Sequence, residues 1–188
     1  HVILIPKVEE AKHLKLVDDK IQSICNKYQW KDPIYLMPII ESASGILNSP
    51  QIAKASKNNV AIAIGLEDYT ADLGVTRTNE GRESLFARSQ IVNAARSAGI
   101  QAIDTVFSDV MDEGGLRSST RRAISMGFEG KGCIHPRQID IIHQEFFPTT
   151  KEIEKAQNSS QIIQNTEIDA IYICTPNHLN KPLTLDSL

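Results

Sequence analysis

The stretch VAIAIGL at residues 60–66 decides the fold, because it is continuously apolar. A strand with one face in water alternates apolar and polar residues, whereas a strand covered on both faces is apolar throughout. Strands of the second kind are typical of parallel sheets. The sequence therefore predicts a parallel sheet that contains this stretch as a buried strand.

Outward from this stretch in both directions, short apolar runs alternate with longer segments that have helical spacing. Gly99 and Gly127 stand where two of the helices are expected to end, and Pro136 begins the last one. The expected strands are 2–6, 34–40, 60–66, 101–109 and 130–136. The expected helices are 9–27, 45–57, 80–98, 113–126 and 136–146.

Repeated strand–helix units imply parallel strands joined by right-handed crossovers. The two usual outcomes are a doubly wound sheet and a (β/α)₈ barrel. No glycine-rich phosphate loop follows the first strand, which disfavours a classical nucleotide-binding fold. Five units do not close an eight-stranded barrel, and the chain begins with His1 rather than Met. We therefore expect an α/β fold of one of these two kinds. If it is the barrel, it is a partial TIM-type (β/α) barrel that lacks about three N-terminal βα units.

Length, charge and cysteine content narrow the class of protein. The 188 residues suffice for one sizeable core but not for two large domains. A net charge of -3 disfavours a broadly basic nucleic-acid binder, and three widely spaced cysteines favour a reducing compartment. There is no apolar run long enough to span a bilayer and no signal-peptide pattern. We expect a cytoplasmic protein that binds neither nucleic acid nor membrane.

Polar side chains cluster where the predicted strands end. Glu41 ends the strand at 34–40, and Asp68 follows the strand at 60–66. Catalytic groups of barrel enzymes lie at such strand ends, so these two carboxylates can point into one cavity. Two carboxylates held together repel each other unless a cation lies between them, and oxygen ligands with room for water suit Mg²⁺. On spacing alone, a metal pair and two unrelated loop acids explain the pattern equally well.

Other polar residues near the strand ends each allow two interpretations. Glu67 is a solvated loop acid or helix cap, or it contributes only its backbone amide. His135 is a general base or ligand, or it caps the helix that Pro136 begins. Lys7 and Lys131 contact phosphate or carboxylate groups, or they are ordinary rim charges.

Six segments occur in a fixed order between residues 2 and 157: LIPKVEEA, IIESASGILNSPQIA, AIGLEDYTADLG, ARSQIVNAARSAGIQAIDTVFSD, MGFEGKGCIHPRQI and FFPTTKEIEKAQ. Together they resemble the citrate lyase β-subunit branch of the HpcH/HpaI aldolase superfamily. A single segment would be a weak signal, but six in order are specific. The resemblance implies that a Glu at one strand end and an Asp in a GxEDxxxDLG stretch bind Mg²⁺; here these are Glu41 and Asp68.

The resemblance also implies a reaction, the cleavage of a citryl thioester, carried on coenzyme A or an acyl carrier protein, to oxaloacetate and an acetyl thioester. Mg²⁺ would act as a Lewis acid on the substrate oxygen that becomes a ketone. The backbone amides of Leu66 and Glu67 are candidate anchors for the substrate carboxylate, and the catalytic base stays unassigned. The implied partners are the acyl-CoA or acyl-ACP substrate and further copies of the chain or other lyase subunits.

Two alternatives to this function stay open. A malyl-CoA or methylmalyl-CoA lyase would use the same metal pair on a different acid. A non-catalytic fragment would be an open half-barrel whose exposed edge strands favour association with a partner. In that case the carboxylates would be present without a complete active site.

The segment EIDAIYICTPNHLNKPLTLDSL, residues 167–188, does not continue the lyase pattern. It resembles part of the Gfo/Idh/MocA oxidoreductase family, with Asn180 where that family often has His after a TPN turn. No GxGxxG accompanies it, so we expect no NAD binding. We expect residues 1–157 to form the incomplete barrel lyase domain and residues 158–188 to be a tail of uncertain origin, either fused or a diverged lyase terminus.

Overall fold

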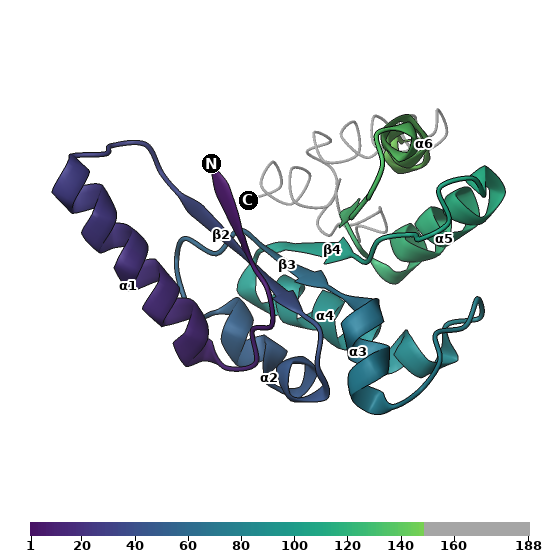
Figure 1. Ribbon diagram of the computed structural model, residues 1–188, viewed down its shortest axis with the longest axis horizontal. Helices are drawn as coiled ribbons and strands as arrows, with labels where there is room; N and C mark the ends of the chain where they lie inside the picture. Colours follow the sequence, from purple (N-terminus) through teal and green to yellow (C-terminus); the bar gives the residue numbers. More distant parts are fainter. Residues whose placement is uncertain (149–188) are drawn as a thin grey trace, which may run out of the picture.

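The computed structural model describes residues 1–148, which form one parallel sheet with helices in its connections (Figure 1). The strands are β1 (Val2–Ile5), β2 (Tyr35–Ile40), β3 (Ala61–Ile64), β4 (Gln101–Asp104) and β5 (Gly130–Lys131). The helices are α1 (Ala11–Tyr28), α2 (Ala43–Ala53), α3 (Leu66–Leu73), η1 (Arg82–Ser84, a 3₁₀ turn), α4 (Leu85–Ala98), α5 (Glu113–Met126) and α6 (Arg137–Phe146).

The order of the strands in the sheet is their order along the chain, β1-β2-β3-β4-β5, and every neighbouring pair is parallel. A doubly wound sheet reverses its strand order at a switch point, whereas a barrel adds each strand beside the previous one. The described residues therefore have the arrangement of five successive units of a (β/α) barrel. This confirms the partial TIM-type barrel predicted from the sequence.

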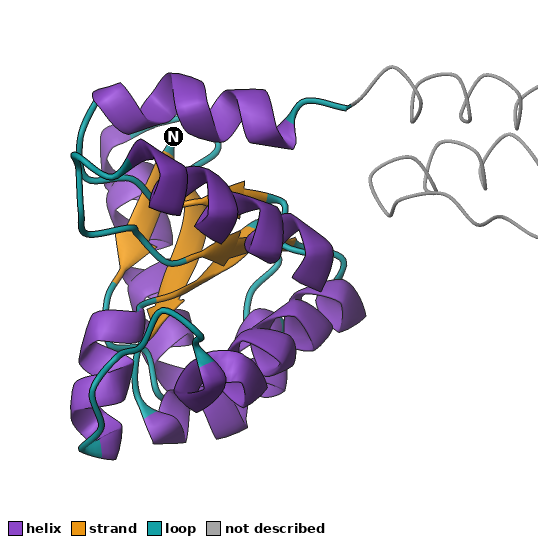
Figure 2. Cartoon of the chain, turned by 90° about the vertical axis from the view of Figure 1, so that its right-hand side faces the viewer, coloured by secondary structure: helices purple, strands orange, loops and turns teal. Residues whose placement is uncertain are grey.

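The main core lies between the sheet and its helices. All four residues of β3 are buried, as the continuous apolar stretch predicted. In β2 the buried positions alternate, so Leu36 and Ile40 face the core, where they join Ile46 and Ile52 of α2 and Ile91 of α4. The helices lie around the strands (Figure 2), which leaves the carboxyl ends of the strands to carry the loops.

Three elements differ from the sequence prediction. Residues 66–73, where no helix was predicted, form α3, which ends at Gly74 with a positive φ of 70°. The predicted strand at 101–109 stops at Asp104, and the one at 130–136 contains only two strand residues. The pairing of β4 with β5 ends at Asp104 and Lys131, so the apolar residues Val106 and Phe107 lie in the loop after β4.

Two further predictions concern parts of the chain beyond the sheet. Among residues 1–148, no helix is both long and apolar enough to cross a membrane. The domain boundary expected after residue 157 and the tail expected at 158–188 lie outside the described residues.

Candidate metal centre

Glu41 stands at the end of β2, directly opposite a glycine. In the parallel register Ile40 pairs with Ile64, so the next residues, Glu41 and Gly65, lie beside each other. A Cβ at Gly65 would stand 2.7 Å from Glu41 Oε2 and 3.0 Å from Glu41 Cβ. Since the φ of Gly65 is -106°, the glycine is needed here for space rather than for backbone conformation.

Asp68 lies in the first turn of α3, and its side chain reaches the same cavity as that of Glu41. This cavity has a volume of about 280 Å³. Its lining consists of Lys7, Glu9, Glu41, Ser42, Asp68, Ala71 and Asp72. The structure thus brings together the two carboxylates that the sequence placed on one rim.

Lys7 connects the two carboxylates. Its backbone N–H donates to Glu41 Oε1 at 2.9 Å, and its ammonium lies 3.2 Å from Asp68 Oδ2. The residue has a φ of 52°, which is uncommon for a side chain other than glycine and often marks functional sites. The hydrogen bond and charge of Asp68 raise the pKa of the Lys7 ammonium. A positive charge is therefore accommodated beside Asp68.

The donors in this cavity fit a magnesium ion better than zinc. Within residues 1–148, no group of three or more His, Cys, Asp or Glu side chains gathers around one point, as a site made entirely of protein ligands would require. Two carboxylates and a nearby hydroxyl, that of Ser42, leave coordination positions for water or substrate. Mg²⁺ is usually held in this way, by one or two carboxylates with the remaining positions filled by water and substrate oxygens.

Asp72 is a cavity residue that the sequence prediction missed. Its Oδ2 accepts a hydrogen bond of 2.7 Å from the backbone N–H of Ala43, the first residue of α2. Ser42 caps the same helix, accepting from Gly45 N at 3.1 Å. Asp72 stands one helical turn after Asp68 and joins α3 to the start of α2, so it fixes the wall of the cavity. The spacing Asp-x₃-Asp in a short helix was the signal for it.

The backbone amides proposed as substrate anchors have different surroundings. The Leu66 N–H already donates to Thr105 Oγ1 at 3.2 Å, in a buried position. The Glu67 side chain accepts from Arg77 and, at 3.0 Å, from Ser108 Oγ. Glu67 therefore points to the side of α3 away from Asp68, and its backbone amide is the remaining candidate anchor.

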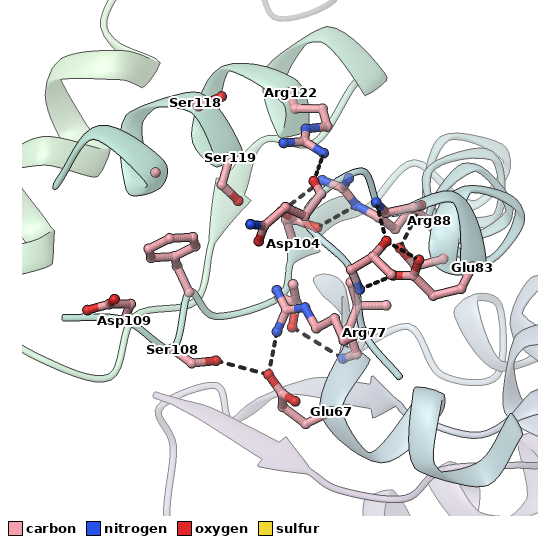
Figure 3. Close-up of a pocket in the computed structure, with 18 of the residues that line it drawn as sticks. Glu67, Arg77, Glu83, Arg88, Asp104, Ser108, Asp109, Ser118, Ser119 and Arg122 are labelled. Carbon is pink, nitrogen blue, oxygen red and sulfur yellow. Dashed lines mark hydrogen bonds and ion pairs between the residues drawn. The ribbon is translucent and has the colours of Figure 1, made fainter. Parts of the chain in front are cut away.

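That other side of α3 holds a larger cavity of about 600 Å³, shown in Figure 3. Its charged groups are largely paired with each other: Arg77 with Glu67, and Arg88 with Asp104. Arg122 donates to the backbone oxygens of Asn79 and Glu80. The carboxylates in its lining outnumber the arginines, so the cavity is not a basic pocket for anions.

Neither His135 nor Lys131 lines either of the two cavities. His135 Nδ1 accepts from the backbone N–H of Arg137, the first residue of α6, at 3.2 Å. Lys131 was expected at the rim, but its side chain is fully buried. Its ammonium donates to Asp104 Oδ2 at 2.8 Å and to the Thr105 carbonyl at 2.9 Å.

The comparisons with known proteins agree with one another. The model of the HpcH/HpaI aldolase/citrate lyase family matches residues 1–136. Citrate lyase subunit beta of Leuconostoc mesenteroides subsp. cremoris is 40% identical over 169 residues, which is 88% of this chain and 55% of that protein. The chain thus spans about half the length of this curated relative.

Solved structures show the same fold. RipC from Yersinia pestis superposes with a TM-score of 0.71 at 36% identity, covering 81% of this chain and 66% of that one. The citrate lyase beta subunit from M. tuberculosis, complexed with oxaloacetate and magnesium, superposes with a TM-score of 0.65 at 30% identity, covering 78% of this chain and 61% of that one.

Proposed function

Since the chain belongs to the HpcH/HpaI aldolase/citrate lyase family, we propose that it carries the metal site of a Mg²⁺-dependent carbon–carbon lyase. The proposed reaction is the cleavage of citryl-CoA or a citryl acyl carrier protein to oxaloacetate and an acetyl thioester. The observation that carries the proposal is that Glu41 and Asp68, from successive units of the barrel, line one cavity. The magnesium and oxaloacetate bound by the M. tuberculosis relative support the same assignment.

The residues of the cavity have separate tasks in this proposal. Glu41 and Asp68 hold the ion, which when bound supplies a Lewis acid for the substrate oxygen that becomes a ketone. The Glu67 amide, at the positive end of α3, binds a substrate carboxylate. Lys7, whose ammonium lies 3.2 Å from Asp68 Oδ2, would contribute a positive charge that favours an anionic substrate in the same cavity.

The substrate carrier and the protein partners are part of the proposal. A citryl group must be activated as a thioester, because the acetyl fragment leaves as an enolate that the thioester carbonyl stabilises. We propose an acyl-CoA or acyl carrier protein substrate, further copies or lyase subunits as partners, and a lyase domain that ends near residue 157. The rivals are a malyl-CoA or methylmalyl-CoA lyase and a non-catalytic fragment.

Thermal unfolding with and without Mg²⁺ tests the metal site directly. At ten times the Kd, Mg²⁺ should stabilise the wild-type chain by about 1.4 kcal/mol, or about 3–6 °C in Tm. Asp68→Asn and Glu41→Gln should each abolish the shift, whereas Asp19→Asn, at an exposed position of α1, should retain it. If Mg²⁺ does not raise the Tm of the wild-type chain, the metal site is excluded and the non-catalytic fragment is favoured.

The reaction is tested with the purified protein, citryl-CoA and Mg²⁺. Oxaloacetate and acetyl-CoA should form in equal amounts, and Asp68→Asn should abolish both. Cleavage of malyl-CoA to glyoxylate without cleavage of citryl-CoA would assign the rival substrate while leaving the metal site in place.

A further inference from the structure

The first turn of α3, which carries Asp68, is capped by a residue of the loop that follows β4. Its N-cap residue, Gly65, has no side chain to accept a backbone N–H. The Leu66 N–H instead donates to Thr105 Oγ1 at 3.2 Å, across 39 residues of sequence. Leu66 and Thr105 are 4% and 5% exposed, so water does not compete for this bond.

Thr105 is itself held by a buried cluster of charges. Lys131 Nζ donates to the Thr105 carbonyl at 2.9 Å and to Asp104 Oδ2 at 2.8 Å. Arg88 binds both oxygens of Asp104, each at 3.0 Å. The side chains of Asp104 and Lys131 are fully buried and that of Arg88 is 8% exposed. Such a bidentate, desolvated arrangement allows the carboxylate only one orientation.

This cluster is not explained by substrate or metal binding. Arg88 and Asp104 border the larger cavity but bind each other, and Lys131 lines neither cavity. The cluster connects α4, the end of β4 and β5 to one backbone amide of α3. The link from this cluster to the Leu66 amide is the hydroxyl of Thr105.

We infer that Thr105 is a positioning residue, whose hydroxyl fixes the first turn of α3 so that Asp68 meets the metal together with Glu41. The inference rests on the proposed function, because it concerns the same metal site. Glu67 of this turn is also held by Arg77 and Ser108, but the bond to Thr105 is the one made by the backbone of the turn. Holding the Leu66 amide keeps Asp68, two residues later, at a constant place. Residues that orient metal ligands in this way typically change metal affinity by about 10–100-fold when removed.

Calorimetric titration with Mg²⁺ of the full chain tests this inference. Thr105→Val keeps the shape of the side chain but removes the acceptor, and it should weaken Mg²⁺ binding by about tenfold. Thr105→Ser keeps the hydroxyl and should bind within about twofold of wild type. Thr120→Val is the matched control: Thr120 is fully buried, and its hydroxyl donates to Leu116 O at 2.8 Å in α5, remote from α3. The Mg²⁺ affinity of Thr120→Val should be unchanged. This control distinguishes a positioning effect of Thr105 from a general loss of stability.

The outcomes distinguish this inference from the proposed function. If wild type and Thr105→Val bind Mg²⁺ with equal affinity, the positioning role of Thr105 is overturned but the proposed metal site is retained. No binding by wild type overturns both. If Thr105→Val does not fold, Lys131→Met replaces it, because it frees the Thr105 carbonyl but keeps the hydroxyl. The Mg²⁺ affinity of Lys131→Met should fall by up to about tenfold, and an unchanged affinity would count against the inference.

Discussion

The ammonium of Lys7 lies 3.2 Å from Asp68 Oδ2, while the backbone N–H of the same residue donates to Glu41 at 2.9 Å. One residue thus contacts both candidate metal ligands, through two different groups. The backbone contact is made by a residue in the left-handed conformation, with a φ of 52°. The ammonium contact is different, because a metal ion at Asp68 would compete with it for the same oxygen.

Lys7→Met should therefore tighten Mg²⁺ binding, because it removes the competing positive charge. The ion pair is exposed, with side-chain exposures of 75% and 50%, so the gain should be only about two- to fivefold in Kd. Titration calorimetry at low ionic strength measures it. Lys12→Met, which breaks the exposed ion pair of Lys12 with Glu10, is the control and should leave the Kd unchanged. Weaker binding in Lys7→Met would mean that the ammonium supports the metal site rather than competing with it.

Gly65→Ala should damage the metal site more than the fold. The new methyl group would stand 2.7 Å from Glu41 Oε2, so the flexible carboxylate must move away from its present position. We expect Mg²⁺ binding to weaken by about tenfold, as for other changes that misplace a ligand. Gly114→Ala is a suitable control, because a Cβ there approaches only Asp112, at 3.6 Å. It should leave the Kd unchanged, and equal affinities for both variants would show that Glu41 does not bind the ion where it now lies.

The sequence was sufficient to predict the sheet and the meeting of Glu41 with Asp68. The apolar stretch at 60–66 indicated a strand covered on both faces, and β3 is buried throughout. Residues at the carboxyl ends of adjacent parallel strands lie at the same edge of the sheet. Acids that follow β2 and β3 can therefore reach one cavity, as Glu41 and Asp68 do. Whether they bind a metal stays a prediction.

The sequence pattern was insufficient where side chains pair across strands. Lys131 resembles a rim residue by its position, yet the register of β4 and β5 sets it opposite Asp104, and both are buried. Only the register reveals this pairing. α3 was missed because its eight residues are too few to establish helical periodicity, and because no side-chain cap marks its start. Its capping group, Thr105, comes from a distant part of the chain.

The buried cluster should respond asymmetrically to loss of its charges. It contains two cations, Arg88 and Lys131, and one anion, Asp104. Asp104→Asn leaves both cations without a counter-charge and should destabilise the protein by about 3–5 kcal/mol. Lys131→Met keeps the Arg88–Asp104 pair neutral and loses mainly a hydrogen bond to a buried carbonyl, so its cost should be about 1–2 kcal/mol.

Urea unfolding at pH 7 compares the two variants. Burial lowers the pKa of the Lys131 ammonium, and the Asp104 carboxylate opposes that shift. Equal losses of unfolding free energy in Asp104→Asn and Lys131→Met would contradict the view that Asp104 is the centre of the cluster.

The contact between α5 and α6 should weaken in acid because of Glu145. Its carboxylate accepts from Arg121 at 2.6 Å and from Arg117 at 2.9 Å, and it is 10% exposed. The hydrogen bond from Arg121 is the main cause that lowers the pKa of Glu145 below its ordinary value, with Arg117 adding to it. A lowered pKa means that the stabilisation is fully present above the ordinary glutamate pKa and is lost as the pH falls through the lowered one.

Glu145→Gln should therefore be less stable than wild type at pH 7, and the two proteins should converge as the pH falls from about 5 to 3. Urea unfolding at several pH values measures the difference. Glu80→Gln, at an exposed loop position, is the control and should follow the wild-type curve. The curves converge because protonated Glu145 no longer carries the charge that attracts Arg117 and Arg121. In acid, wild type therefore loses the ion pairs that Glu145→Gln lacks at every pH. A constant gap between the two curves would show that packing of the Glu145 side chain against α5, rather than its charge, holds the two helices together.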